Sequence, residues 1–290
     1  MKLKLAQRVV IGYYKTKLKT LALLSPKKAA EASFQLFCTP YSGKPKRKAP
    51  PIFHHAEKLK LEIEGLQVRG WHWKADHPIG KTILIAHGFD SCAYKFDRYV
   101  APLKREGFNV VAFDAPGHGT SDGKILNARI YRDMILKIHR ELFPLNGIMA
   151  HSLGGLATSL AVEQLDPSER PPIVLIAPAV NTVRALDNFF TFLPLGNQIR
   201  HEMELLIEEI GQQPVSYYAT DRAVLSMSQP VLWIHDEQDD ICPFEDVKNI
   251  YQQAPKHVDF VVTQGLGHSR IYRESKIKKQ IVAFLKEKNM

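Results

Sequence analysis

The sequence predicts an α/β fold with a mostly parallel central sheet, helices on both faces and a helical cap insertion. From residue 57 onward, short apolar runs alternate with amphipathic stretches, a pattern typical of a parallel sheet covered on both sides. The stretch EKLKLEIEGLQVRGWHWK, with period-two alternation and a break at Gly65, predicts an antiparallel hairpin that leads into the sheet. Between Ala179 and Pro230 lie about fifty residues, where a single helix would be usual.

The order of the elements follows from these patterns. Apolar runs predict strands within residues 81–89, 109–119, 145–152, 172–179, 230–237 and 257–265. Amphipathic stretches predict helices near residues 96–106, 125–142, 153–165, 244–253 and 271–287. We expect a basic N-terminal arm and linker over residues 1–50 and one α/β domain over residues 51–290, with the cap insertion at about 180–229.

Composition limits the class of protein. The chain has 290 residues, 45% of them hydrophobic, which is enough to bury a full core. Cys38, Cys92 and Cys242 are far apart and form no C-x-x-C pair. This spacing indicates neither a disulfide framework nor a thiolate metal site, so a reducing, cytoplasmic setting fits best. We expect no metal and no organic cofactor.

The positive charge is concentrated at one end of the chain. Of the net charge of +9, residues 1–50 carry +11 and the remaining residues −2. A nearly neutral body argues against a nucleic-acid partner.

The N-terminal arm begins with interleaved apolar and basic residues, LKLAQRVVIGYYKTKLKTLALLSP. Its apolar run Val9 to Tyr14 is too short for a spanning helix or a signal-peptide core. Two interpretations stay open: a surface helix packed on the body, or a helix over residues 1–25 that rests on an anionic membrane. The segment GKPKRKAPP (residues 43–51) has the composition of a linker.

The long interval has an aromatic first part. Phe189, Phe190 and Phe192 crowd the stretch RALDNFFTFLPLGN. We interpret it as a cap whose apolar face covers a substrate pocket. The alternative is that these side chains only pack the cap on the sheet.

Ser152 lies between a predicted strand and a predicted helix in the stretch GIMAHSLGGLATS. A nucleophile there needs a tight turn, and small residues at positions 150 and 154 avoid a collision across that turn. Here they are Ala150 and Gly154, so the pattern G-x-S-x-G has alanine in its first small position. The alternative is an ordinary helix N-cap serine.

A base and an acid are found after later strands. His268, in QGLGHSRI, follows the last predicted strand and can act as general base. The stretch WIHDEQDDICP offers carboxylates to orient that histidine. Asp239 is the preferred acid and Asp240 the second choice.

Two glycine-containing loops follow earlier strands. The stretch HGF (residues 87–89) lies where a backbone N–H could join that of Leu153 in an oxyanion hole, so we predict the main chain of Phe89 and Leu153 for this role. The stretch DAPGHGTSDG (residues 114–123) lacks the spacing of a phosphate-binding loop and is interpreted as structural support.

With HGF, DAPGHGTSD, AHSLGG, HDEQDDICP and GLGHS in this order, residues 57–288 resemble the α/β-hydrolase superfamily. Within it the chain is most similar to small serine esterases, lysophospholipases and serine aminopeptidase-like hydrolases. Two departures from the family pattern are Ala150 and Asp236, which stand where glycine is common.

The resemblance implies a serine hydrolase that opens a carboxylic ester or thioester with an apolar acyl group. Ser152, His268 and Asp239 would form its triad. Two alternatives remain: a ligand-binding member without turnover, and an acyltransferase or C–C bond hydrolase.

Overall fold

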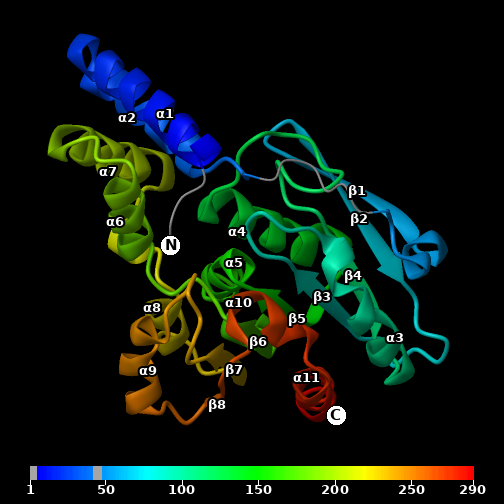
Figure 1. The fold of residues 1–290 in the computed structure, drawn as a ribbon. Coiled ribbons are helices and arrows are strands. Elements are labelled where there is room, and N and C mark those ends of the chain that lie inside the picture. The colour runs from blue at the N-terminus through cyan, green and yellow to red at the C-terminus, as the bar shows by residue number, and fades with distance from the viewer. Residues whose placement is uncertain (1–4, 42–47) are drawn as a thin grey trace. The chain divides into compact units, whose positions relative to one another are not determined.

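The computed structural model describes residues 5–41 and 48–290, residues 5–9 by their backbone alone (Figure 1). Residues 43–47 of the predicted linker and residues 1–4 of the arm lie outside the described part. The chain divides into two compact units. The first unit combines the residues up to Thr39 with Asn181–Tyr218, and the second combines Pro40–Val180 with Ala219–Met290.

The second unit is built on an eight-stranded sheet in the order β1-β2-β4-β3-β5-β6-β7-β8. The strands β1 and β2 form the predicted hairpin, β2 pairs antiparallel with β4, and all later pairs are parallel. The mostly parallel sheet is therefore confirmed. The strands are β1 Glu57–Ile63, β2 Leu66–Trp73, β3 Thr82–Ala86, β4 Asn109–Phe113, β5 Leu145–His151, β6 Ile173–Ile176, β7 Val231–Asp236 and β8 Val258–Thr263.

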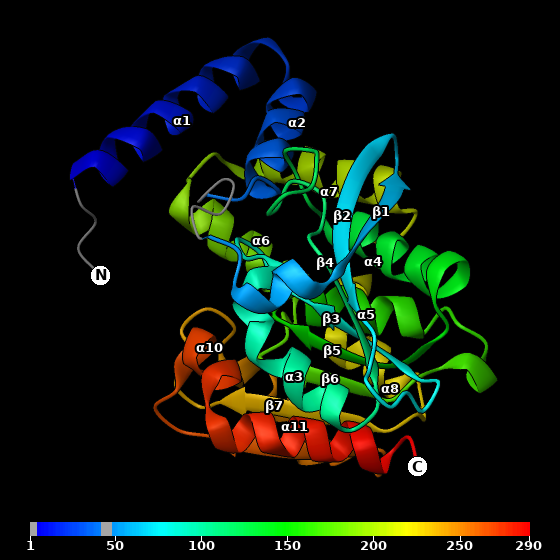
Figure 2. The ribbon, with the colours of Figure 1, turned by 90° about the vertical axis from the view of Figure 1, so that its right-hand side faces the viewer.

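Helices cover both faces of this sheet (Figure 2). In the second unit they are α3 Asp97–Arg105, α4 Ala128–Lys137, α5 Leu153–Val162, α8 Thr220–Leu225, α9 Lys248–Gln253, α10 Gly267–Arg270 and α11 Ser275–Glu287. The alternation along β3 shows why two layers form. Leu84 packs into the cluster that includes α4 and α5, whereas Ile83 and Ile85 pack into the cluster that includes α3 and α11. Each buried strand thus supplies two cores, because successive side chains point to opposite faces.

The first unit consists of α1 Leu5–Leu24, α2 Pro26–Phe37, α6 Thr182–Phe192 and α7 Asn197–Gly211, with a short 3₁₀ turn at Val215–Tyr217. The N-terminus of α2 is capped by Ser25, whose Oγ accepts from the Lys28 N–H at 3.3 Å. A face of α2 with buried Ala29, Ala30 and Phe34 packs in this unit. The apolar stripe of α7 recurs every four residues, at Ile199, Met203 and Ile207.

The segment expected as an insertion is divided between the units. Residues 181–218 lie in the first unit, together with the N-terminal helices, whereas α8 lies in the second. No helix in the described ranges is long and apolar enough to traverse a bilayer.

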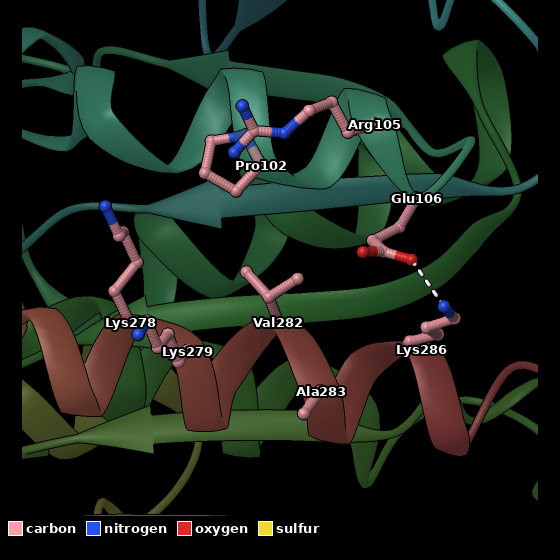
Figure 3. A pocket seen from close by; sticks show the side chains of 8 residues that line it. All are labelled: Pro102, Arg105, Glu106, Lys278, Lys279, Val282, Ala283 and Lys286. Carbon is pink, nitrogen blue, oxygen red and sulfur yellow. Dashed lines mark ion pairs between the residues drawn. The ribbon is translucent and has the colours of Figure 1, made fainter.

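A surface groove runs between α3 and α11 (Figure 3). Pro102, Val282 and Ala283 supply its apolar side chains, and Lys286 forms an ion pair with Glu106 at 2.7 Å. None of the predicted site residues lines this groove, so it has no part in the chemistry considered below.

Candidate active site

Ser152 lies between the end of β5 and the start of α5, two elements that Figure 1 labels. Its backbone has φ 54° and ψ −123°, a conformation that is strained for a residue with a Cβ and costs of order 1–3 kcal/mol. The turn is held because the Ser152 N–H donates to the carbonyl of Ile176 at 3.1 Å, and the Ser152 carbonyl accepts from the Gly155 N–H at 2.8 Å. The hydroxyl accepts no capping hydrogen bond from α5. The N-cap interpretation therefore does not describe this side chain.

The close approach of α5 to the sheet requires glycine after the turn. A Cβ on Gly154 would lie 2.5 Å from the carbonyl oxygen of His87, and one on Gly155 would lie 2.8 Å from Pro178 Cβ. Both distances are shorter than any van der Waals contact. Gly154 thus lets the Ser152 turn lie directly against the loop that follows β3, and Gly155 lets α5 lie against the segment that follows β6.

The structure brings together Ser152 from the turn after β5, Asp239 from the loop after β7 and His268 from the short helix α10 after β8. His268 Nε2 lies 3.0 Å from Ser152 Oγ, and His268 Nδ1 lies 2.8 Å from Asp239 Oδ2. Asp239 is buried, whereas Asp240 points to solvent. Only the first of the two candidate carboxylates therefore reaches the histidine.

Two backbone N–H groups predicted for an oxyanion hole flank this turn. Within the described ranges, the N–H groups of Phe89 and Leu153 donate to no protein acceptor. The backbone of Gly88 passes so close to the turn that a Cβ there would lie 2.9 Å from Ser152 Cβ. Leu153 directly follows the serine, and Phe89 follows the glycine that passes it, so their role in an oxyanion hole stays a prediction.

Comparison with known proteins shows which proteins the chain is similar to. The family model described as serine aminopeptidase, S33, matches residues 77–205. The lysophosphatidylserine lipase ABHD12 of Danio rerio is 23% identical over 287 residues, which covers 85% of this chain and 74% of that protein. The uncharacterized hydrolase YugF of Bacillus subtilis (strain 168) is 24% identical over 251 residues, which cover 72% of this chain and 90% of that protein. The solved structure of the Pyrococcus furiosus esterase Pf2001 superposes with a TM-score of 0.61 at 20% identity, covering 84% of this chain and 96% of that one.

The chain has the α/β-hydrolase fold and is similar to hydrolases of this fold.

The loop that supplies Phe89 in this hydrolase is held by two buried histidines. His87 Nδ1–H donates to the Gly88 carbonyl at 2.7 Å, and His87 Nε2 accepts from the Ala115 N–H at 2.9 Å. His118 Nε2 accepts from the Asp90 N–H at 3.1 Å. Burial lowers the pKa of each imidazole to about 4, so both are neutral and can accept these bonds.

The glycine-rich stretch 114–123 supports the same loop. The buried Asp114 carboxylate accepts from the N–H of Ala93 at 2.9 Å and from the N–H and hydroxyl of Thr120 at 2.7 and 3.0 Å. Gly119 has φ 50°, and a Cβ there would overlap Asp114 Oδ2 at 2.0 Å. The stretch also provides His118 and Ala115, the two residues that contact the loop after β3.

Hydrogen bonding keeps the Asp239 carboxyl charged in spite of its burial. Burial alone raises the pKa of this group, but bonds from His268 and from the N–H groups of Ile241 and Cys242, the latter two at 2.9 and 2.8 Å, outweigh it. The net effect is a pKa below the usual aspartate value. The neighbouring Cys242 is different: burial raises the pKa of its thiol, which stays protonated.

Asp236 lies near Asp239 and has hydrogen bonds that the sequence did not predict. It is fully buried at the end of β7. Its Oδ2 accepts from the Thr263 hydroxyl at 2.6 Å and the Leu266 N–H at 3.0 Å, and its Oδ1 accepts from the Gln238 N–H at 3.0 Å. Asp236 therefore ties the loop of Asp239 to the loop that carries His268. The only signal in the sequence was the departure from glycine at this position.

His151 makes a second tie to the same loop. Its Nε2–H donates to the backbone carbonyl of His268 at 3.0 Å, and the two rings lie 4.7 Å apart. Burial, reinforced by the neighbouring His268, lowers the pKa of His151 to about 3. A neutral ring with one N–H fits this single donated bond. No pattern in the sequence distinguished His151 from the other histidines.

The phenylalanines predicted to line a pocket lie on α6 in the first unit. Phe189 is buried there and contacts the rings of Phe37 and Phe190 at 5.4 Å between centroids. Phe192 is 53% exposed. Their contact with a substrate stays a prediction.

Proposed function

We propose that this hydrolase cleaves carboxylic esters or thioesters with an apolar acyl group by forming an acyl-enzyme on Ser152. The observation that carries the proposal is the pair of distances around His268, 3.0 Å to the serine Oγ and 2.8 Å to the Asp239 carboxylate. The strained backbone at Ser152 adds to it, since such strain is concentrated at functional sites. The names of the matched lipase and esterase support an acyl ester as the substrate class.

The first half of the reaction follows from the proton positions. The ionised Asp239 carboxylate accepts from His268 Nδ1–H, which leaves a lone pair on Nε2 facing the Ser152 hydroxyl. As Oγ attacks the carbonyl carbon, its proton moves to Nε2 and the carbonyl oxygen becomes an oxyanion. The N–H groups of Phe89 and Leu153 would donate to that oxyanion. A donor of this kind contributes about 10²–10³-fold in rate.

The second half returns the serine to its starting state. The imidazolium of His268 gives its proton to the departing alkoxide or thiolate, and the acyl group stays on Ser152. Water then attacks the acyl-enzyme with His268 again as the base, which releases the acid. The buried charge of Asp239 favours the imidazolium in both steps.

A fluorophosphonate probe tests the nucleophile directly. We expect the wild type to be labelled and Ser152→Ala to be unlabelled. Ser226→Ala removes a hydroxyl from the exposed end of α8 and is the matched control, expected to be labelled like the wild type. Equal labelling of Ser152→Ala, or absence of labelling in the wild type, would contradict the proposal.

A panel of p-nitrophenyl esters from short to long acyl chains then tests the substrate class. We expect kcat/KM to rise with acyl length before it levels off, because each buried methylene adds about 0.8 kcal/mol of binding. Tight binding of the esters without turnover would instead indicate a ligand-binding protein. Product transfer to an added alcohol in place of water would indicate an acyltransferase.

A further inference from the structure

The outer face of α1 carries large apolar side chains that the first unit leaves in solvent. Leu18 on the opposite face is 1% exposed, whereas Val10 and Tyr13 are 54% and 60% exposed. At the C-terminal end of the helix, Leu23 and Leu24 are 88% and 83% exposed, more than nearly all other large apolar side chains of the described residues. An isolated exposed leucine is ordinary, but four such residues on one helix form a surface that calls for a partner.

The positions of these residues follow the helical repeat. Residues 10, 13, 17, 20 and 24 are spaced by alternate steps of three and four, so they form one stripe along α1. Val10, Tyr13 and Leu24 are the apolar members of this stripe. Leu23 lies beside its end, at the corner where α1 turns into α2 through Ser25 (Figure 2).

The charge around this face has one sign. Lys17 and Lys19 on α1 and Lys27 and Lys28 at the start of α2 are exposed. Within the described residues none of these four ammonium groups is paired with a carboxylate. The first acidic residue of the chain is Glu31, beyond the corner. Lys17 lies 6.0 Å from the Tyr13 ring, so cationic and apolar groups are interleaved.

We propose that the outer face of α1 and the corner at Leu23 and Leu24 bind the surface of an anionic lipid bilayer. The two leucines insert between the lipid head groups, and the four lysines contact lipid phosphates and carboxylates. A helix whose exposed apolar side chains are bordered by lysines is suited to lie in the interface of a bilayer rather than across it. This inference does not depend on the reaction at Ser152.

Charge complementarity favours a bilayer over a second copy of this chain. A symmetric dimer through the same face would bring each lysine cluster against its own copy. Because no carboxylate lies on α1 to offset them, that arrangement is repulsive. An anionic bilayer supplies both the negative charge and the apolar phase.

Vesicle sedimentation with the full chain tests this proposal. We expect binding to vesicles of phosphatidylcholine with about one third phosphatidylserine, little binding to phosphatidylcholine alone, and loss of binding as the salt concentration rises to about 0.5 M. Leu23→Ser/Leu24→Ser should weaken the partition by about tenfold or more, and Lys27→Gln/Lys28→Gln by about fivefold.

Matched controls come from the second unit. Ile79→Ser/Leu225→Ser replaces two exposed apolar side chains, 50% and 43% exposed, and Lys58→Gln/Lys60→Gln replaces two exposed lysines of β1. Both should bind vesicles like the wild type. Ser152→Ala should also bind like the wild type, so a failed reaction mechanism would leave this test intact.

Three results would overturn the proposal. The first is equal vesicle binding by the wild type and Leu23→Ser/Leu24→Ser. The second is binding that ignores phosphatidylserine and salt. The third is a lipid-free dimer in analytical ultracentrifugation that Leu23→Ser/Leu24→Ser dissociates, since the face would then be occupied by a second copy.

Discussion

The surroundings of Ala150 explain how the serine turn tolerates a methyl group at the first small position of the G-x-S-x-G pattern. The side chain is fully buried in the core cluster shared by α4 and α5. On the neighbouring strand β3 its partner is Ala86, another small residue, and on β6 it is Leu175. The extra methyl therefore fills core volume instead of crowding the Ser152 hydroxyl. The sequence showed the departure, but only the strand register shows where the methyl points.

Asp239 and Asp240 give a matched pair for testing the acid of the triad. Asp239→Asn keeps the size of the side chain but removes the charge that stabilises the His268 imidazolium, so we expect kcat for an ester to fall by about 10²–10⁴-fold. Asp240→Asn changes an exposed carboxyl of the same loop and should stay within about twofold of the wild type. Steady-state kinetics on both variants measures the difference. A larger loss in Asp240→Asn would reverse the assignment.

The sequence could predict that Ser152, Asp239 and His268 lie close together, because each follows a strand of the parallel sheet and functional residues gather at these strand ends. It could not separate Asp239 from Asp240 by geometry, since the two are adjacent in one loop. The contacts of His151 were also out of reach. These contacts depend on which residues lie beside the His151 side chain in the folded protein, and a single sequence does not show that.

At the scale of the elements, Asp236 connects the end of β7 with the segment between β8 and α10. We infer that this tie fixes the separation of Asp239 and His268, which makes Asp236 a positioning residue. Its hydrogen bonds from Thr263, Leu266, Gly267 and Gln238 outweigh burial and hold the pKa of the carboxyl below its usual value. The depressed pKa means that the tie stabilises the fold above about pH 4 and weakens as the pH falls through the folded-state value.

We expect Asp236→Asn to lower kcat by about tenfold or more with a smaller change in KM, because an amide cannot accept from all the donors that face it. The control is Glu237→Gln, whose wild-type carboxylate bridges to Gln264 between the same two segments but on the surface. Separate measurement of kcat and KM distinguishes displacement of His268 from a loss of substrate binding. If kcat is unchanged while the protein is merely less stable, Asp236 only supports the fold.

The helices and strands themselves were largely predictable. Apolar runs of five to seven residues between glycine-rich turns marked β3, β4 and β5, and β7 and β8 were equally clear. The partner of α2 was not predictable. The apolar face of α2 is visible in the sequence. However, α2 packs against α7, which comes more than a hundred residues later. Amphipathic periodicity shows which face of a helix is buried but not which element covers it.

At the scale of the whole molecule, buried histidines couple the stability of the second unit to pH. His87, His118 and His151 are at most 5% exposed, and burial lowers their pKa values to about 4, about 4 and about 3. An unfolded histidine titrates near pH 6.5. Between about pH 6.5 and pH 4 the unfolded chain therefore binds protons that the folded chain does not, so the free energy of unfolding falls as the pH falls.

We expect this loss to reach about 2 kcal/mol per histidine between pH 8 and about pH 5. Urea denaturation followed by tryptophan fluorescence reports the unfolding of the second unit, because all three tryptophans are buried there. In His118→Asn the free energy of unfolding should change less between pH 8 and pH 5, by about the contribution of one histidine. His54→Asn removes an exposed imidazole and should leave the difference unchanged. A free energy of unfolding that is flat across this range would show that the three imidazoles accept protons in the folded state, which would contradict their role as neutral acceptors and donors around Ser152.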